Sequence, residues 1–390
     1  MSYLKYEIEE LKLNGGLHTA KEISSQPEMW VETYNRLFKE KDQIAKFTGD
    51  FLQNENPYVI LTGAGTSAFI GEALVGAYQR EWGITARAIA TTDIITHPGD
   101  YFIRPRPTLL VSFARSGDSP ESLATVELAK KHCDKLYILN ITCNKDGELA
   151  AKTGSRDSYV FLLPEETNDR SLAMTSSYTS MLLAGLLVLN INDIDSMQPL
   201  VTKLAGYGNY IINKYLTDLN GLAKTDIERM VFLGSGPLMG AAHESHLKVQ
   251  ELTDGRVVCK YDSFLGFRHG PRAVVNNSTV VVYLMSNNPL VRKYELDLIK
   301  SVSETGIGFK FIAIGADIDA KGLGIDLAVN YPGSTEDIPD EFLPVIYVLP
   351  AQIIGFYKSL SLGLSPDSPS NSGSISRVVQ GVKIYENTFA

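Results

Sequence analysis

The sequence predicts an α/β protein made of two tandem doubly wound domains, each with a parallel sheet. The segments Tyr58–Gly65 and Met230–Gly236 are both apolar runs that end in Gly-x-Gly, and their first glycines are 171 residues apart. The apolar run Thr108–Phe113 recurs at the same offset as Thr279–Leu284. Short β-branched runs alternate with helical patterns in both copies, which is typical of a parallel sheet with helices on both faces. We therefore expect one α/β unit to be present twice.

The parts of the chain follow in order. The N-terminal segment has no glycine-rich loop and is predicted to be helical, because four apolar residues recur at helical spacing and indicate a docked face: Trp30, Tyr34, Leu37 and Phe38. In each domain, a helical pattern follows the second strand, at Glu121–His132 and Leu290–Glu304. We predict four parts: an N-terminal segment (residues 1–50), a first domain (51–205), a second domain (206–365) and a C-terminal tail (366–390). We expect the tail to pack near the active site through its valines and Ile384.

Composition narrows the class of protein. The chain has 390 residues, 44% of them hydrophobic and 21% charged, as in globular proteins. A net charge of −9 argues against a nucleic-acid binder. The longest apolar run, Met181–Leu189, is shorter than the roughly 20 residues that span a membrane. Three scattered cysteines predict neither a disulfide framework nor a zinc site, and no signal-peptide pattern is present, so we expect a cytoplasmic protein without a metal or membrane partner.

Two loops at the ends of neighbouring predicted strands in the first copy are expected to hold an anion. Ser119 is a suitable N-cap, and Pro120 fits the first position of the helix that follows. A helix start of this kind offers hydroxyls and free backbone amides to a phosphate group. Arg115 adds a charge-assisted contact. The candidate phosphate-binding residues are Gly65, Thr66, Ser67, Arg115, Ser116 and Ser119.

Other interpretations of these loops remain open. Serines also cap helices that bind no ligand. A dinucleotide site is disfavoured, because Ala68 leaves G-x-G-x-x-G incomplete and Asp93 lies thirty residues beyond Gly63, where roughly 20 are expected. The second copy has Ser286-Asn-Asn-Pro289 at the place of the cradle and lacks the Ser-Gly-x-Ser pattern. We therefore expect only the first copy to have kept a phosphate site.

A helical pattern behind the second glycine turn carries the candidate acid–base residues. Glu244, Lys248 and Glu251 are spaced i, i+4, i+7 and so share one face. The helix starts at a strand's carboxyl end, where clefts form, and a carboxylate beside a lysine there is a candidate general base. The alternative is a solvated, salt-bridged stripe on the surface.

The histidines allow two roles. His243 and His246 are three residues apart, but no third ligand is near and Glu244 does not complete His-Glu-x-x-His, so we predict no metal site. His269 lies in a loop that Gly270 and Pro271 bound. Histidine is the residue type suited to proton transfer near neutral pH, although a histidine in a loop is often only a surface residue.

Four motifs occur in the order seen in sugar isomerase (SIS) domain proteins: Gly-Ala-Gly-Thr-Ser at 63–67, Ser-Phe-Ala-Arg-Ser-Gly-Asp-Ser at 112–119, Lys-Val-Gln-Glu at 248–251 and Arg-His-Gly-Pro at 268–271. Over about residues 45–385, the chain resembles the isomerase half of glucosamine-6-phosphate synthase. It resembles more closely the AgaS group, known as tagatose-6-phosphate ketose/aldose isomerases or galactosamine-6-phosphate deaminases. The resemblance implies two flavodoxin-like SIS domains.

The resemblance also implies roles for the candidate residues. The serines and threonine of the two loops match positions that bind phosphate and sugar. Glu251 matches the carboxylate that moves a proton between C1 and C2, and Lys248 lies beside it in the same motif. His269 matches the ring-opening histidine, which in the synthase comes from a neighbouring subunit. A homodimer or larger homo-oligomer with shared sites is therefore expected.

The chain departs from the synthase pattern in three places. Ala114 stands where the synthase has a serine, and Arg115 stands where it has a glutamine, which changes the expected phosphate contacts. The C-terminal catalytic lysine of the synthase has no clear counterpart, and Arg377 falls nearest to it. Because an arginine is a poor base and does not readily form a Schiff base, we expect Arg377 to contact substrate.

These observations predict an enzyme that acts on a hexosamine 6-phosphate without a cofactor. Position 2 is serine, and about 50 residues precede the first SIS unit, so we expect no glutaminase and therefore release of ammonia rather than its addition. The resemblance favours conversion of galactosamine 6-phosphate to tagatose 6-phosphate. Plain tagatose-6-phosphate ketose/aldose isomerisation is the alternative reaction. A non-catalytic sugar-phosphate sensor is the alternative of another class, but residues 1–50 lack the basic helix-turn-helix that such regulators usually carry.

Overall fold

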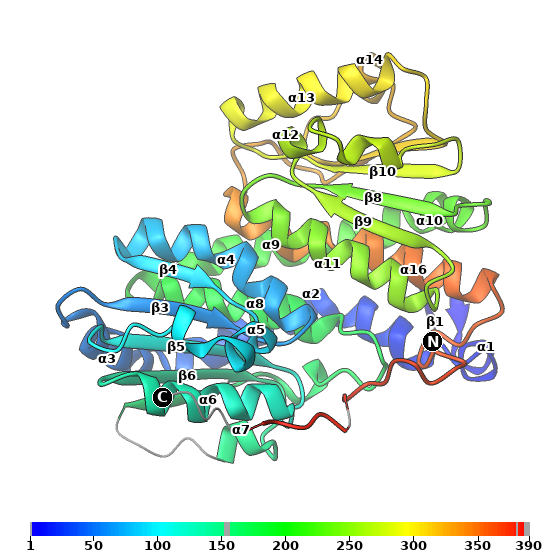
Figure 1. Cartoon of the computed structure of the whole chain (residues 1–390). Helices are drawn as coiled ribbons and strands as arrows, with labels where there is room; N and C mark the ends of the chain where they lie inside the picture. The colour runs from blue at the N-terminus through cyan, green and yellow to red at the C-terminus, as the bar shows by residue number, and fades with distance from the viewer. Residues whose placement is uncertain (1, 152–156, 380, 386–390) are drawn as a thin grey trace.

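The computed structural model describes residues 2–151, 157–379 and 381–385. This part of the chain contains two five-stranded parallel sheets with helices on both faces (Figure 1), which confirms the prediction of two tandem doubly wound domains. The first sheet has the order β4-β3-β5-β6-β7, and its strands, from β3 to β7 along the chain, are Tyr58–Thr62, Thr85–Ala88, Thr108–Ala114, Leu136–Thr142 and Ser158–Leu162. The second has the order β12-β11-β10-β8-β9, and its strands from β8 to β12 are Arg229–Leu233, Val258–Asp262, Thr279–Leu284, Lys310–Gly315 and Leu327–Asn330.

The two sheets have the same topology. In each, the first strand along the chain lies between the second and the third, and every pairing in both sheets is parallel. The registers also correspond, since Leu109 lies opposite Val59 in the first sheet and Val281 lies opposite Val231 in the second. Strand order therefore reverses beside β3 in one sheet and beside β8 in the other. Ligands of open α/β sheets bind at such points, outside the carboxyl ends of the strands.

Helices and a short hairpin complete the described fold. The hairpin pairs β1 (Ser2–Tyr3) with β2 (Tyr6–Glu7). Helices α1 to α8 are Ile8–Leu13, Leu17–Lys39, Lys41–Leu52, Thr66–Trp82, Thr91–Thr96, Pro120–His132, Glu148–Ala151 and Ser176–Leu189. Helices α9 to α16 are Ile194–Lys214, Leu216–Ala223, Pro237–Leu252, Phe264–Phe267, Pro289–Ser303, Ala320–Leu323, Leu343–Tyr347 and Leu349–Ser361. A 3₁₀ turn, Asp340–Phe342, precedes α15.

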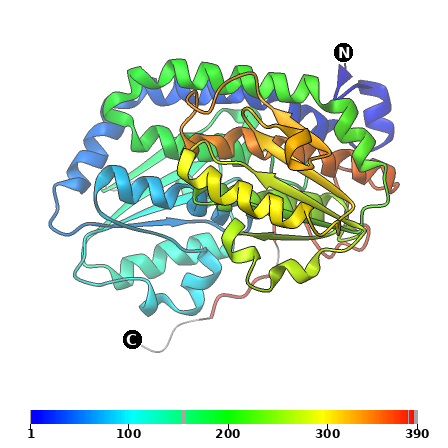
Figure 2. The same ribbon diagram turned by 90° about the horizontal axis from the view of Figure 1, so that it is seen from above.

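The N-terminal helices are joined to the rest of the fold. Helix α2 packs against α8 and α9, and Figure 2 shows α2 and α9 along one side of the molecule. The predicted apolar face is confirmed, since Trp30 and Leu37 are fully buried and the Trp30 indole donates to Thr179 Oγ1 at 2.9 Å. The predicted domain boundaries after residues 50 and 205 fall inside the continuous helices α3 and α9, and the division into domains stays a prediction.

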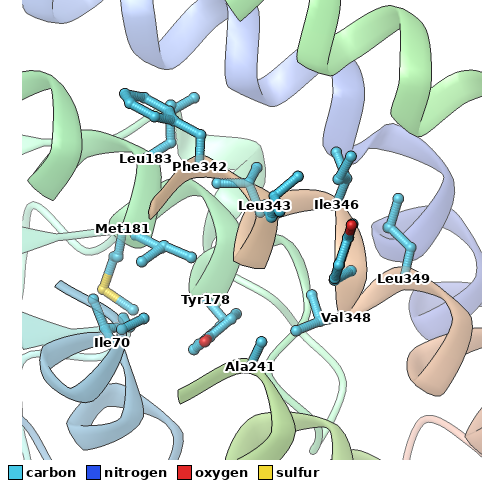
Figure 3. Packing of buried hydrophobic residues seen from close by; sticks show 14 of the residues in the cluster. Ile70, Tyr178, Met181, Leu183, Ala241, Phe342, Leu343, Ile346, Val348 and Leu349 are labelled. Carbon is cyan, nitrogen blue, oxygen red and sulfur yellow. The ribbon is translucent and has the colours of Figure 1, made fainter. Parts of the chain in front are cut away.

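Side chains from both halves of the chain form one core between the sheets (Figure 3). Tyr178 and Met181 of α8 belong to it together with Ala241 of α11. Phe342 and Leu343, at the start of α15, belong to the same buried cluster. The core therefore fixes the second domain against the first, beside α4 and α11.

Among the described residues, one helical stretch is long and apolar enough to cross a membrane by length and composition, namely residues 340–361. Its apolar window of 18 residues is 94% buried inside the protein, where α16 packs against α10 and α11. The paired helices Ser176–Leu189 and Ile191–Lys214 pass the same test only together and are bent by 81°. Core helices of globular proteins have the same composition, because a helix that is apolar all round is buried.

The described part of the C-terminal tail contacts the first domain and α2. Asp367 accepts hydrogen bonds from the backbone N–H groups of His18 and Thr19, at 3.1 and 2.8 Å, and so caps α2. The expected packing of the tail's apolar residues is wrong for two of them, since Val379 is 59% and Ile384 39% exposed. Polar contacts hold the tail instead.

The first helices of the two domains, α4 and α11, pack against each other across Gly240. A Cβ atom at Gly240 would lie 2.6 Å from the backbone nitrogen of Ala73 and 2.8 Å from the backbone oxygen of Phe69. Backbone atoms at such distances cannot move aside cheaply, so this glycine allows the two helices to approach closely.

We expect Gly240→Ala to lower the free energy of unfolding by about 1–3 kcal/mol, because it overpacks the contact between α4 and α11. Gly76→Ala is the matched control, since Gly76 lies in α4 and a Cβ atom added there would meet no other atom within 4 Å. It should stabilise by about 0.4–1 kcal/mol. Denaturant unfolding measures both, and equal effects would contradict the close-packing interpretation.

Candidate functional site

The Gly-x-Gly loops make tight connections from strand to helix. Gly65 and Gly236 are the N-caps of α4 and α11, with φ of 55° and 56°, a backbone conformation that favours glycine. A Cβ atom at Gly63 would lie 2.6 Å from the backbone of Ser67. These glycines therefore bring Thr66 and Ser67 directly to the carboxyl end of β3, where both side chains are buried.

The candidate acid–base residues form a buried cluster, here called the charge triad: Glu244, Lys248 and Glu251. Lys248 Nζ lies 2.7 Å from Glu251 Oε2 and 3.3 Å from Glu244 Oε1. It also donates to Thr66 Oγ1 at 3.0 Å, which joins α11 of the second domain to the first turn of α4. The structure therefore excludes the solvated stripe, because the side chains of Lys248 and Glu244 are fully buried. Glu251 is the accessible member, with its side chain 23% exposed.

Burial and charge set the protonation of the triad. Burial raises the pKa of Glu244 to about 8, against the opposing charge of Lys248. Burial lowers the pKa of Lys248, but the carboxylates of Glu244 and Glu251 outweigh it, so the net shift is upward. Near neutral pH, a protonated Glu244 beside a charged Lys248 leaves the ammonium paired with Glu251. This arrangement leaves the carboxyl group of Glu251 at the accessible edge of the cluster, where it is placed to accept and return a proton.

The loop after β5 presents free backbone amides. Ser119 is the N-cap of α6, and Pro120 is its first residue, as predicted, but the Ser119 side chain does not cap the helix. It donates instead to Glu121 Oε2 at 2.8 Å. Within the described part of the chain, the amides of five residues have no acceptor: Ser116, Gly117, Ser119, Glu121 and Ser122. Because β5 pairs with β3, this loop and the Thr66 loop lie at neighbouring strand ends and form what we call the first cradle.

Arg115 differs in placement from what we expected. Its Nη1 donates to the backbone oxygens of Ser171 and Leu172, at 3.2 and 3.0 Å, and its Nη2 donates to the backbone oxygen of Arg377. Burial lowers the pKa of Arg115, while Asp169 opposes this shift. The guanidinium is thus buried and hydrogen-bonded to backbone carbonyl groups, two before α8 and one in the tail. A phosphate contact from Arg115 stays a prediction.

Arg377 brings the tail to the first domain. Its Nε donates to the backbone oxygen of Asp169 and its Nη2 to Asn168 Oδ1, both at 2.8 Å. A cavity of about 330 Å³ lies beside Arg377 and is lined also by Glu165, Asn168 and Arg170. Arg377 therefore lies beside this cavity, while the packing of the tail near the active site and the contact of Arg377 with substrate stay predictions.

Sequence reasoning missed the segment between β7 and α8. Asp169 is fully buried and accepts from the backbone N–H groups of Thr175 and Ser177, at 2.8 and 2.9 Å. Burial raises the pKa of Glu22, beside it, to about 7, and the charge of Asp169 adds to that shift. Met174 Sδ lies 4.0 Å from Ser67 Oγ, so this segment adjoins the first cradle. The run of serine and threonine before the apolar stretch at 181–189 was a detectable signal of a capped helix start.

His269 is not part of the charge triad within one chain. It is exposed after the short helix α12, and its ring makes no hydrogen bond or ion pair with any described residue. His243 stacks between Phe69 and Tyr261, at centroid distances of 3.5 and 3.8 Å. Among the described residues, no group of three or more histidine, cysteine or acidic side chains could hold a metal ion.

Comparison with known proteins identifies the class of this protein. Residues 51–191 match the SIS domain, in agreement with the sheet topology and the cradle. The chain is 38% identical over 388 residues to "D-galactosamine-6-phosphate deaminase AgaS" of Shewanella sp. (strain ANA-3), a match that covers 98% of this chain and 96% of that protein. It is 40% identical to the protein of the same name from Escherichia coli O157:H7, over 95% and 96% of the two chains. The chain therefore belongs to the AgaS family of SIS-domain proteins.

Solved structures agree with this assignment. A Clostridium novyi NT protein, proposed to be a tagatose-6-phosphate ketose/aldose isomerase, has a TM-score of 0.95 at 38% identity and covers 99% of this chain and 100% of its own. The tagatose-6-phosphate ketose/aldose isomerase of Escherichia coli has a TM-score of 0.87 at 36% identity, over 95% and 97%. The C-terminal domain of a Francisella tularensis glucosamine-fructose-6-phosphate aminotransferase shares the fold at 19% identity, with a TM-score of 0.75.

The upward pKa shift of Glu244 predicts a pH dependence of stability. With a folded pKa of about 8 against an ordinary value of 4.5, the folded state retains a proton that the unfolded state releases. The contribution of Glu244 is therefore fully present below about pH 4.5 and is lost as the pH rises toward 8. Glu244→Gln should make unfolding free energy decline less steeply between pH 5 and 8 than in the wild type.

Denaturant unfolding at several pH values measures this slope. Glu228→Gln is the control, because Glu228 is exposed and should leave the slope unchanged. Glu22 and Glu295, whose pKa values burial raises to about 7, remain in both variants and keep part of the decline. Identical slopes for wild type and Glu244→Gln would show that Glu244 does not hold a proton in the folded protein.

Proposed function

We propose that this protein is an enzyme that converts D-galactosamine 6-phosphate and water to D-tagatose 6-phosphate and ammonia. The observation that carries the proposal is the contact of Lys248 with both Glu251 and Thr66, which places a partly exposed carboxylate beside the first cradle. The names of the AgaS relatives support the substrate, and those of the structural neighbours support the product. We infer a cytoplasmic location from the phosphorylated sugar that the names of the AgaS relatives give as substrate.

The phosphate group is proposed to bind the free amides of the first cradle, with Thr66, Ser67, Ser116 and Ser119. A phosphate at a helix N-terminus is favoured by the exposed N–H groups and by the helix dipole. A phosphate bound there anchors the open-chain sugar, so that C1 and C2 lie beside Glu251 in the same position in every turnover. Such positioning is a large part of the rate that an enzyme supplies.

Glu251 is proposed to transfer the proton. Once the ring is open, the carboxylate takes the proton from C2 of the amino aldose and forms an enolamine. Return of this proton to C1 gives the imine of the ketose at C2. Water adds to the imine, and ammonia leaves as the C2 carbonyl forms. The ammonium of Lys248, 2.7 Å from Glu251 Oε2, holds this carboxyl group in position for the transfer.

His269 is proposed to open the pyranose ring in the site of a neighbouring subunit. Its side chain is exposed and has no described partner in its own chain, as a group that reaches into another subunit requires. We therefore propose a homodimer or a larger homo-oligomer with shared sites. Most soluble oligomers are symmetric homo-oligomers.

Plain ketose/aldose isomerisation of tagatose 6-phosphate is the second candidate. The name of the Escherichia coli structural neighbour favours it, and the same carboxylate would move the same proton. The two reactions differ only in whether the C2 substituent is an amine or a hydroxyl. Detection of ammonia separates them.

Incubation of purified protein with galactosamine 6-phosphate should release ammonia and form tagatose 6-phosphate, while glucosamine 6-phosphate should not react. Glu251→Gln should lower kcat by about 10²–10⁴-fold, the usual contribution of general acid–base catalysis, and should still bind sugar phosphate. Glu228→Gln is the active control. Isomerisation of tagatose 6-phosphate without ammonia from either amino sugar would favour the second candidate. A protein that binds sugar phosphate and turns over neither substrate would be a sensor.

Mixing two inactive variants tests the shared site. In a dimer, Glu251→Gln and His269→Asn subunits reassembled together should form one site with both native residues in each mixed dimer. Random mixing should then restore about a quarter of wild-type activity. The same variants mixed without subunit exchange are the control. No recovery despite demonstrated exchange would place His269 and Glu251 in the same chain's site.

A further inference from the structure

The second domain retains the loop that corresponds to the first cradle, and this loop is filled by the chain itself. It follows β10 and leads into α13, as the first cradle follows β5 and leads into α6. The backbone N–H of Ser286 donates to Glu295 Oε2 at 2.9 Å. The backbone N–H of Asn287 donates to Asp340 Oδ1 at 2.7 Å, and the Ser286 hydroxyl donates to Asp340 Oδ2. The side chains of Glu295 and Asp340 thus accept hydrogen bonds from the backbone amides that would otherwise be free to bind an anion.

The helix start of α13 is satisfied as well. Asn288 Oδ1 accepts from the backbone N–H groups of Leu290 and Val291, at 2.9 and 3.3 Å. The backbone N–H of Asn288 donates to Ser286 Oγ at 3.0 Å. In the loop after β5, the Asp118 N–H likewise donates to Ser116 Oγ at 3.3 Å, but Ser119 does not cap α6, and the amides of Glu121 and Ser122 have no acceptor among the described residues. The two copies therefore differ in whether their donors already have acceptors, although the strand–loop–helix path is the same.

Asp340 reaches this loop from a different part of the chain. It begins the 3₁₀ turn Asp340–Phe342, which leads into α15. This turn packs beside α4, α8 and α11, and Phe342 lies in the core of Figure 3. Ser286 and Glu295 are fully buried, whereas Asp340 is only partly buried at the edge of the loop. A carboxylate that is partly removed from water in this way is tolerated when hydrogen-bond donors surround it.

We propose that the carboxylate of Asp340 is a built-in ligand of the loop between β10 and α13, here called the second cradle. It takes there the place that the phosphate of our proposed function takes in the first cradle. The cradle of the second domain thereby acts as an internal anion clamp that fixes the start of α15 against the sheet. It leaves one sugar-phosphate site in each chain, in the first domain. The clamp also supports the core behind α11, which carries the charge triad.

Chemical rescue tests the clamp. Asp340→Ala should lower Tm and leave a small anion-binding hole, which formate can fill. Formate should then recover about half or more of the lost Tm, relative to chloride at the same ionic strength, because a ligand that binds only the folded state stabilises it. The matched control is Glu341→Ala, since the neighbouring Glu341 pairs with Arg80 at 2.9 Å and not with the loop. Formate should shift that variant no more than the wild type.

Asp340→Asn separates the charge from the shape. The amide keeps an oxygen for the Asn287 N–H and fills the space, so this variant should lose less Tm and gain nothing from formate. If Asp340→Ala does not fold in chloride, its refolding yield in formate against chloride measures the same rescue. A formate effect equal in Asp340→Ala and Glu341→Ala would overturn the proposal. So would rescue of Asp340→Asn to the same degree as Asp340→Ala. Neither result depends on which sugar phosphate the first domain binds.

Discussion

The buried ammonium of Lys248 is the interaction on which the arrangement of the site depends. It comes from the second domain, contacts Thr66 of the first, and lies within 3.3 Å of the side chains of both Glu244 and Glu251. A buried cation is costly unless it is paired and hydrogen-bonded, so α11 must stay within reach of α4. Gly240, which has no side chain, permits α11 to approach α4 this closely. Packing and electrostatics therefore require the same spacing between the two helices.

The internal repeat explains how one fold can supply two different chemical elements. Both copies place a glycine turn and a helix start at adjacent strand ends. In the first copy the amides beside α6 are free, whereas in the second they are engaged by Glu295, Asp340 and Asn288. The second copy then contributes its other helix, α11, with the acid–base groups. The two copies therefore supply different groups because a few of their side chains differ, while their topology is the same.

Much of the fold and part of the site could be predicted from the sequence, because both depend on local patterns. The repeat at 171 residues indicated the strands, and the i, i+4, i+7 spacing indicated the common face of the charge triad. Burial of that face could not be predicted, since the same spacing suits a solvated surface. The partners of Arg115 were also beyond local reasoning, because Ser171 and Arg377 meet it only through tertiary packing. The same holds for Asp340 in the second cradle, 53 residues from Asn287.

The cap that Asp367 provides to α2 has a consequence for how the chain is made. Helix α2 is synthesised early, but its N-terminal amides at His18 and Thr19 find their acceptor only when residue 367 has been added. Its apolar face likewise waits for α8 and α9. During vectorial synthesis, in which N-terminal parts leave the ribosome first, α2 can dock on α8 and α9 once Lys214 has been added, but its first amides lack their acceptor until Asp367 follows. The start of this early helix is thus among the last parts of the fold to be fixed in place.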